Sequence, residues 1–243
     1  MNPPTVSAVV PVFNRTCWLP DSLGSIMRQA VPGLEIIVVD DGSTEEIESV
    51  VRAHCPAADY FRQANRGPAA ARNAGVARAR GTYVAFLDDD DTWPEGSLAA
   101  RLRALAEDPA ALFVLGRTRF VAAPGAPEPW VATNLGAGLF RRDLFDRVGL
   151  LNERCGLTDD LDWFLRVREA AVPYVILADE TLHYRRDTGG LTSGRSWGEL
   201  EVLGTLRASL ARRRANGVAA EMPLLSGSKD NPRAVGPVNH ERG

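Results

Sequence analysis

Short apolar runs alternate along the first half of the chain with stretches whose apolar residues recur every three or four positions. The runs at 6–12, 34–40 and 82–88 have the length and composition of strands that are buried on both faces. Residues 19–27 have the apolar spacing of one helix face. Because strand and helix alternate from residue 6 to about 107, the pattern predicts a parallel, doubly wound sheet. Such sheets bind ligands beyond the carboxyl ends of their strands.

Turn and capping signals predict the remaining elements. Ser43 opens a helix capping box at 43–46, and Pro68 is expected to begin an alanine-rich helix. The second half is less regular, and a polar, Arg-rich helix is expected from Ser196, followed by a tail of disordered composition. The other expected elements are strands at 60–63, 112–121 and 174–177, a helix near 98–105, a loop at 123–129, a Gly-rich approach to a short helix at 134–140, and a helix at 159–170.

Composition narrows the classes of function. The chain has 243 residues and a formal net charge of −3, and no block of basic residues interleaves with aromatic ones, so no nucleic acid partner is expected. Three cysteines in no Cys-x-x-Cys pair are typical of reduced thiols. The amino terminus lacks the pattern of a signal peptide, and no apolar run approaches the roughly 18 residues that span a bilayer. We therefore expect a soluble, cytoplasmic protein.

Four consecutive aspartates, Asp88 to Asp91, directly follow a predicted strand. Two carboxylates about 4 Å apart repel each other by about 4 kcal/mol at an effective dielectric of 20. A solvated turn is one interpretation, because Asp is common in turns. The favoured interpretation is a divalent cation site, because carboxylate oxygens suit Mg²⁺ or Mn²⁺. In strand geometry, Asp88 and Asp90 would converge on one side while Asp89 and Asp91 diverge.

Other polar residues have both a structural and a functional interpretation. Asp40 or Asp41 could bind a nucleobase or ribose, although such residues often cap the next helix. Arg72 lies in the first turn of a predicted helix, where anions are favoured, but it could simply be solvated. Asp159-Asp160 could supply a general base, whereas capping by Thr158 and the helix dipole favour a structural role. His183 is expected to be structural or solvated.

Seven short motifs in this order resemble the family 2 glycosyltransferases of the GT-A fold. The resemblance covers about residues 4–195. The motifs are "VVPVFNR", "IIVVDDGS", "QANRGPAAARNAG", "GTYVAFLDDDDTW", "FRRDLFDRVGLLNE", "TDDLDWFLR" and "LHYRRD". The resemblance implies an α/β fold with a Rossmann-like, mostly parallel central sheet flanked by helices, a smaller mixed acceptor-side region and a C-terminal helix and tail. It also implies a nucleotide-sugar donor, most often a UDP-sugar, a divalent cation such as Mn²⁺ or Mg²⁺, and transfer with inversion.

The resemblance assigns roles to individual positions on the nucleotide side. Pro11, Phe13 and Asn14 match the loop that lies along the base. Asp41 matches the carboxylate that reads the pyrimidine, and Arg72 matches an arginine that faces the nucleotide.

The resemblance likewise assigns the metal ligand and the base. Asp88, Asp89 and Asp90 align with the family's D-x-D motif, with Asp90 on the metal and the other two toward ribose or metal-bound water. Asp160 matches the general base, which reverses the structural interpretation above. The counter-charge of the aspartates would then be metal plus nucleotide, present only with bound donor.

The resemblance also implies boundaries. We expect a glycosyltransferase domain over 1–195, with a nucleotide-sugar-binding half at 1–91 and an acceptor-binding half at 92–195. A C-terminal helix and tail would occupy 196–243. Arginines at 207–214 could contact the inner face of a membrane, although a solvated helix face is the commoner explanation.

Two departures from the family pattern affect the expected chemistry. Asp187 stands where many relatives have a histidine that can approach the metal. The Gln-x-x-Arg-Trp motif of processive synthases is absent, which favours transfer of one or a few sugars. The alternatives are a nucleotidyltransferase of related fold, disfavoured because no glycine follows the first strand, and a catalytically silent sugar-nucleotide-binding module. The acceptor stays open among glycans, lipid-linked glycans, peptides and small molecules, as does the oligomeric state.

Overall fold

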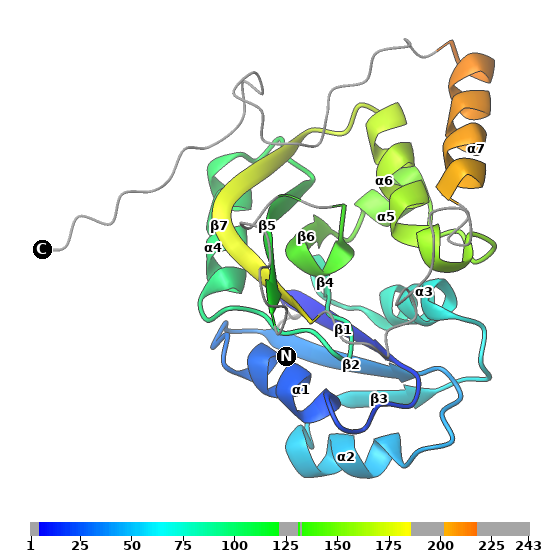
Figure 1. Cartoon of the computed structure of the whole chain (residues 1–243). Helices are drawn as coiled ribbons and strands as arrows, with labels where there is room; N and C mark the ends of the chain where they lie inside the picture. The colour runs from blue at the N-terminus through cyan, green and yellow to red at the C-terminus, as the bar shows by residue number, and fades with distance from the viewer. Residues whose placement is uncertain (1–4, 122–130, 132, 186–201, 218–243) are drawn as a thin grey trace, which may run out of the picture.

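A computed structural model describes residues 5–121, 131, 133–185 and 202–217. The first half of the chain forms the elements that its hydrophobic pattern predicts, with small shifts at their ends (Figure 1). These are β1 (Val6–Val12), α1 (Leu19–Met27), β2 (Leu34–Asp40), α2 (Ile47–His54), β3 (Asp59–Arg62), α3 (Pro68–Arg78), β4 (Tyr83–Phe86) and α4 (Ser97–Glu107).

The second half adds shorter and more varied elements. They are β5 (Phe113–Val121), the 3-10 turn η1 (Leu135–Ala137), β6 (Gly138–Arg141), α5 (Leu144–Val148), the 3-10 turn η2 (Gly156–Thr158), α6 (Asp159–Glu169), β7 (Tyr174–Arg185) and α7 (Val202–Ala215). The loop expected at 123–129 and the tail expected after α7 lie outside the described residues.

The seven strands of the described residues join one sheet in the order β3-β2-β1-β4-β6-β5-β7. The strands β3, β2, β1 and β4 run parallel, and β5 and β7 are also parallel to each other. Only β6 among them runs antiparallel to both of its neighbours, β4 and β5. The predicted mostly parallel α/β sheet is therefore confirmed, and it extends through both halves of the chain.

The helices cover both faces of this sheet, as the alternation of elements predicts. One apolar cluster joins the sheet to α1, α2 and α4. A second cluster, rich in aromatic rings, joins the opposite face to α3, α5 and α6. The turns that follow the parallel strands therefore lie at one edge of the sheet, between the two layers of helices that pack on its faces.

Two predicted strand lengths were wrong. The strand β7 continues to Arg185, well past the predicted end at 177, and pairs with β5 over most of its length. The second half of β7 includes polar, partly exposed residues and therefore has no unbroken apolar run. The hydrophobic pattern predicts only the first part of the strand, where the apolar residues are consecutive. The strand β4 ends at Phe86, two residues before the predicted end, and the aspartates therefore lie beyond it.

The predicted helix caps at Ser43 and Thr158 were also wrong. The helix α2 begins after Glu46, without a side-chain cap, and Ser43 Oγ instead accepts a hydrogen bond of 2.8 Å from Asn14 N. Thr158 does precede α6, but its hydroxyl bonds to Cys155 O at 2.9 Å and pairs with Thr205 Oγ1 at 2.7 Å. Both hydroxyls bind neighbouring segments in place of their own helix.

The small residues of α3 let it approach β1 closely. A Cβ atom placed on Gly75 would overlap the side chain of Val9, which lies in the middle of β1. We expect Gly75→Ala to lower the free energy of unfolding by about 1–3 kcal/mol, because a packed interface must shift to admit the methyl group.

Urea denaturation of Gly75→Ala measures this effect, with Gly204→Ala in α7 as the control. A Cβ on Gly204 meets nothing within 4 Å, so its alanine variant should equal or exceed the wild type in stability. Equal midpoints for wild type and Gly75→Ala would show that α3 lies farther from β1.

None of the helices in the described part of the chain combines the length and the apolar composition needed to cross a bilayer.

Candidate active site

The residues assigned from sequence gather where three neighbouring parallel strands end. The strands β2, β1 and β4 are adjacent in the sheet, so the segments after Asp40, Val12 and Phe86 leave it at the same edge. Asp41 N donates to Val12 O at 2.8 Å, and Leu87 N donates to Val9 O at 3.0 Å, which keeps the three chain segments in register as they leave the sheet. This edge is the expected ligand-binding position in a doubly wound sheet.

Arg72 connects this edge to α6. It lies in the second turn of α3, one residue past the predicted first turn, is 9% exposed, and donates from Nη2 to Asp88 at 2.6 Å and from Nη1 to Asp159 at 2.8 Å. Burial disfavours its charge, but the carboxylates of Asp88 and Asp159 outweigh burial and raise the pKa of Arg72. One permanently charged guanidinium therefore bridges the aspartate run and the second carboxylate pair.

The four aspartates divide among three partners, and their predicted strand-like alternation was wrong. Asp88 binds Arg72, whereas Asp89 and Asp90 both face Arg15. Asp91 is buried and accepts a hydrogen bond of 2.8 Å from the backbone of Arg185. The alternation fails because β4 ends at Phe86, and the run itself forms a turn at Asp89 and Asp90.

Arg15 is a site residue that sequence reasoning missed. Asn14 and Arg15 have successive positive φ angles of 56° and 73°, a left-handed conformation that costs energy in residues other than glycine. Asn14 Oδ1 accepts a hydrogen bond of 2.9 Å from Thr44 N, which fixes this turn. The turn places Arg15 against Asp90, with Asp89 at 3.4 Å. The expectation that only metal and nucleotide supply counter-charge was therefore wrong.

The aspartate run nevertheless keeps a shortage of positive charge. Burial, followed by the charge of Asp88, raises the pKa of Asp90 even though Arg15 opposes both. Burial and the charge of Asp90 raise the pKa of Asp89 well above its usual value. Carboxylates whose pKa is raised in this way would be stabilised as anions by a nearby cation.

The donor set fits a divalent cation that is shared with a ligand. The described residues contain no group of three or more His, Cys, Asp or Glu arranged to hold a metal ion by themselves. Mg²⁺ and Mn²⁺ do not require one, because a phosphate-bound cation usually takes one or two protein carboxylates and completes its shell with phosphate and water oxygens. Asp88 and Asp90, whose side chains are 35% and 17% exposed, are available for that arrangement.

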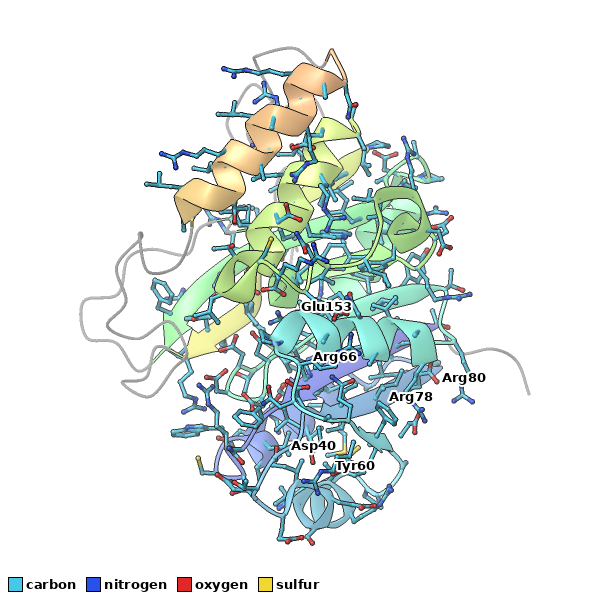
Figure 2. All side chains as sticks on the ribbon, turned by 90° about the vertical axis from the view of Figure 1, so that its right-hand side faces the viewer. Asp40, Tyr60, Arg66, Arg78, Arg80 and Glu153 are labelled. Atoms are coloured by element: carbon cyan, nitrogen blue, oxygen red, sulfur yellow. The ribbon has the colours of Figure 1, made fainter. Side chains whose placement is uncertain are left out.

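Asp40 and Asp41 point to different neighbours. Asp40 accepts hydrogen bonds from Tyr60 Oη at 2.7 Å and from Ser43 N at 2.8 Å (Figure 2). Asp41 accepts hydrogen bonds of 3.0 Å from Arg66 N and 2.7 Å from Gly67 N, in the loop that leads into α3. Asp40 is therefore structural, and Asp41 fixes the position of the helix that carries Arg72.

Two further contacts hold the segment before α6 against α3. Asn73 forms a reciprocal pair with the backbone of Leu151, with both hydrogen bonds at 3.0 Å. Arg66 and Glu153, which Figure 2 shows beside α3, form an ion pair at 2.6 Å. Sequence reasoning missed Asn73 and Glu153 because nothing in the hydrophobic pattern links residues so far apart.

Asp160, the predicted general base, lies in the first turn of α6. Its Oδ1 accepts a hydrogen bond of 2.7 Å from Leu161 N. Burial and then the charge of Asp159 raise the pKa of Asp160 to about 7, although Arg72 opposes them. A carboxylate with a pKa near 7 is a stronger base than an ordinary carboxylate, so it accepts a proton more readily. Near neutral pH, a large fraction of the molecules still carry it in the ionised form.

The remaining sequence predictions concern the edges of the site. Phe13 is 43% exposed, as a base-stacking residue requires. Pro11 is buried inside β1 opposite Val39, so its assignment to the loop was wrong. His183 pairs through its backbone with Thr92 and has Nε2 at 3.6 Å from Glu180, which agrees with a structural role. Asp187 lies outside the described residues.

Comparison with known proteins now places the chain in a family. The model of glycosyl transferase family 2 matches residues 7–147, and the chain belongs to this family. The confirmed fold is the one that the sequence motifs predict.

Individual relatives share parts of the chain. An uncharacterized glycosyltransferase of Rickettsia bellii is 39% identical over 106 residues, which are 42% of this chain and 15% of that protein. The chain thus spans less than a fifth of the length of this relative and of two others from Rickettsia.

Solved structures share the fold of the chain at lower identity. The S. aureus TarS 1-349 structure in complex with UDP-GlcNAc has a TM-score of 0.71 at 21% identity, over 85% of this chain and 66% of TarS 1-349. The mannosyltransferase PcManGT from Pyrobaculum calidifontis, in complex with GDP-Man and Mn²⁺, has a TM-score of 0.63 at 20% identity, over 88% and 76% of the two chains. Both have a GT-A-type fold.

Proposed function

We propose that the protein is a metal-dependent, inverting glycosyltransferase that moves a sugar from a nucleoside diphosphate, UDP in preference, to an acceptor hydroxyl. The observation that carries the proposal is the bridge made by Arg72, with Asp88 at 2.6 Å and Asp159 at 2.8 Å. This bridge joins the carboxylates that suit a diphosphate-bound cation to the segment that carries a carboxylate of pKa about 7. Membership of glycosyl transferase family 2 supports it.

In the proposed reaction, Asp160 accepts the proton of the acceptor hydroxyl as the acceptor oxygen bonds to the anomeric carbon. The bond between that carbon and the diphosphate oxygen breaks, and its electron pair leaves with the nucleoside diphosphate. Attack from the face opposite the leaving group inverts the anomeric configuration. Arg72 keeps α6 beside the aspartate run, and its charge opposes a further rise in the pKa of Asp160.

Asp90 would hold the divalent cation, with Asp88 and Asp89 toward the ribose and metal-bound water. When bound, the cation would offset the negative charge that develops on the leaving diphosphate. In the described structure, the guanidinium of Arg15 contacts the carboxylate of Asp90. A cation could bind Asp90 only if this side chain moved away.

The nucleoside would lie against the loop after β1. Phe13 offers an exposed ring to the base, and Asn14 fixes that loop through Thr44. Asp41 already accepts three hydrogen bonds, and a carboxylate can accept about four, so one position is left for a pyrimidine. TarS in complex with UDP-GlcNAc supports a UDP-sugar, whereas PcManGT in complex with GDP-Man shows that a relative of this fold takes another base.

A nucleotide-sugar panel tests the proposed function. Purified protein is incubated with UDP-, GDP- and dTDP-sugars and Mn²⁺, and release of the nucleoside diphosphate is measured with and without EDTA. We expect cation-dependent release from at least one UDP-sugar. Release of pyrophosphate from a nucleoside triphosphate and a sugar phosphate would indicate a nucleotidyltransferase. Donor binding without turnover, with a panel of glycan, lipid-linked and small acceptors, would indicate a silent binding module.

Asp90→Asn is expected to weaken Mn²⁺-dependent UDP binding by about tenfold or more. Loss of a residue that merely supports a metal ligand typically costs 10–100-fold in metal affinity, and a direct ligand should cost at least as much. Calorimetry of UDP binding with and without Mn²⁺ measures the change.

The matched variant is Arg15→Gln, which removes the guanidinium that faces Asp90. It should change Mn²⁺ affinity in the opposite direction, because the cation no longer competes with Arg15. Equal UDP affinity with and without Mn²⁺ in the wild type would contradict the assignment of Asp90 to a metal.

A further inference from the structure

The helix α7 has the reverse of the usual amphipathic arrangement, because polar side chains face the protein. Thr205 and Ser209 are buried, and Thr205 Oγ1 lies 2.7 Å from Thr158 Oγ1. Ser209 Oγ donates to Glu169 at 2.5 Å, and Arg212 contacts Glu169 at 2.8 Å. These hydrogen bonds and ion pairs attach α7 to α6, beside which it lies at the rim of the molecule (Figures 1 and 2).

The opposite face of α7 is apolar. Leu203, Leu206 and Leu210 are 60%, 40% and 47% exposed. They account for half of the large hydrophobic residues that are exposed in the described part of the chain, although α7 has only fourteen residues. Their spacing of three and four positions places them along one stripe of the helix. A scattered exposed leucine needs no explanation, but a continuous stripe marks an interaction surface.

Positive charge flanks this stripe. Arg207 and Arg214 are exposed and follow Leu203 and Leu210 by four positions, which places them beside the leucines on the same side of the helix. The sequence of α7 contains four arginines and no acidic residue, although the whole chain has a net charge of −3. Arg212 is already paired with Asp162 and Glu169, so Arg207 and Arg214 give the outer face its exposed charge.

We propose that the face of α7 formed by Leu203, Leu206, Leu210, Arg207 and Arg214 docks on an anionic membrane surface. Leucines insert at the boundary of headgroups and acyl chains, and arginines remain at the level of acidic headgroups, when such a helix lies parallel to the membrane. The interaction is peripheral and does not depend on the reaction proposed above.

The charge of α7 favours an anionic membrane over a second copy of the chain as the partner of this face. Two α7 helices meeting through their leucines would bring arginines together, with no carboxylate on either helix to pair with them. An acidic bilayer supplies both an apolar layer and a continuous negative potential. Because only three leucines and two exposed arginines take part, binding should be reversible and should weaken as salt is added.

Co-sedimentation of the full chain with sucrose-loaded vesicles tests this surface. Vesicles of phosphatidylcholine alone are compared with vesicles that contain about 30% phosphatidylglycerol. We expect binding to the anionic vesicles to exceed binding to the neutral ones by about tenfold, and to fall at high salt. The double variant Arg207→Gln/Arg214→Gln should lose most of this preference.

The triple variant Leu203→Ser/Leu206→Ser/Leu210→Ser should bind anionic vesicles at least about tenfold more weakly than the wild type. Its inward-facing residues are unchanged, and an unaltered melting temperature would exclude misfolding as the cause. Leu150→Ser is the control, because Leu150 is also exposed, at 46%, but lies far from α7 in sequence.

Either of two results would overturn the proposal. The first is equal binding of wild type and the triple variant to anionic vesicles, or no binding by the wild type. The second is a dimer, measured by light scattering, that the triple variant loses while vesicle binding is unchanged, which would assign the face to a second copy.

Discussion

Asp160→Asn is expected to reduce glycosyl transfer by about 10²–10⁴-fold while leaving donor affinity nearly unchanged. The amide cannot accept the proton of the acceptor hydroxyl, but it keeps the size of the carboxylate and can still accept the hydrogen bond of 2.7 Å from Leu161 N. The aspartate run and the loop after β1, which are proposed to hold the donor, are unaltered. The loss should therefore appear in kcat and not in the affinity for UDP.

Steady-state turnover and calorimetric binding of UDP measure the two effects separately. Asp146→Asn, which changes an exposed carboxylate in α5, serves as the control and should be fully active. Unchanged turnover in Asp160→Asn would remove this residue as the base, and a parallel loss of UDP affinity would indicate a binding role.

Arg72→Met is expected to lower the free energy of unfolding by about 3–5 kcal/mol, and so the melting temperature by roughly 6–20 °C. Arg72 is almost fully buried and carries the positive charge at 2.8 Å from Asp159, which is itself 4% exposed in its side chain. Methionine fills similar space but leaves that carboxylate buried without a counter-charge. Removing one partner of a buried ion pair costs more free energy of folding than the intact pair contributes, because the other charge stays buried without a counter-charge.

The same substitution at the last residue of α3 provides the control. Arg78 pairs with Asp59 at 3.0 Å, and both side chains are about 40% exposed, so Arg78→Met should cost at most about 1 kcal/mol. Equal melting temperatures for the two variants would exclude the bridging role of Arg72.

The fold could be predicted where a whole helix or strand has a single regular pattern of apolar residues. The strands β1 and β2 lie between helix layers, so they appear in the sequence as unbroken apolar runs. The second half of β7 could not be predicted in this way, because its residues beyond Leu177 mix exposed polar side chains with the buried Thr181 and Leu182 and form no unbroken apolar run. Its pairing with β5 is a tertiary contact that no local pattern encodes.

The candidate site was predicted through the order of the motifs and not through any single one. That order identified Arg72, Asp88 and Asp160, and the structure brings their segments together. Asp159 was overlooked as a partner of Arg72, because the two residues are 87 positions apart. Arg15 was missed because its placement depends on two successive left-handed residues; Asn14, which adopts that conformation more readily than most residues, was the available signal.

The ion pairs of the aspartate run alter the expected behaviour of the protein without ligand. The sequence suggested a cluster that is neutralised only when donor and cation bind. In the structure, Arg15 faces Asp89 and Asp90, and Arg72 faces Asp88. In the proposed reaction, the cation bound with the donor would replace Arg15 as the counter-charge of Asp90, while Arg72 would remain between Asp88 and Asp159.

Asp160, at the start of α6, is proposed to act as the base of a reaction at the carboxyl edge of the sheet. The pH dependence of kcat/KM for the donor tests it most directly, because this parameter reports ionisations of the free enzyme. With the pKa of Asp160 raised to about 7, we predict that kcat/KM falls about tenfold per pH unit below pH 7 in the wild type. This limb should be absent from the residual activity of Asp160→Asn. A wild-type profile that stays flat down to pH 5, or the same limb in both proteins, would contradict the account.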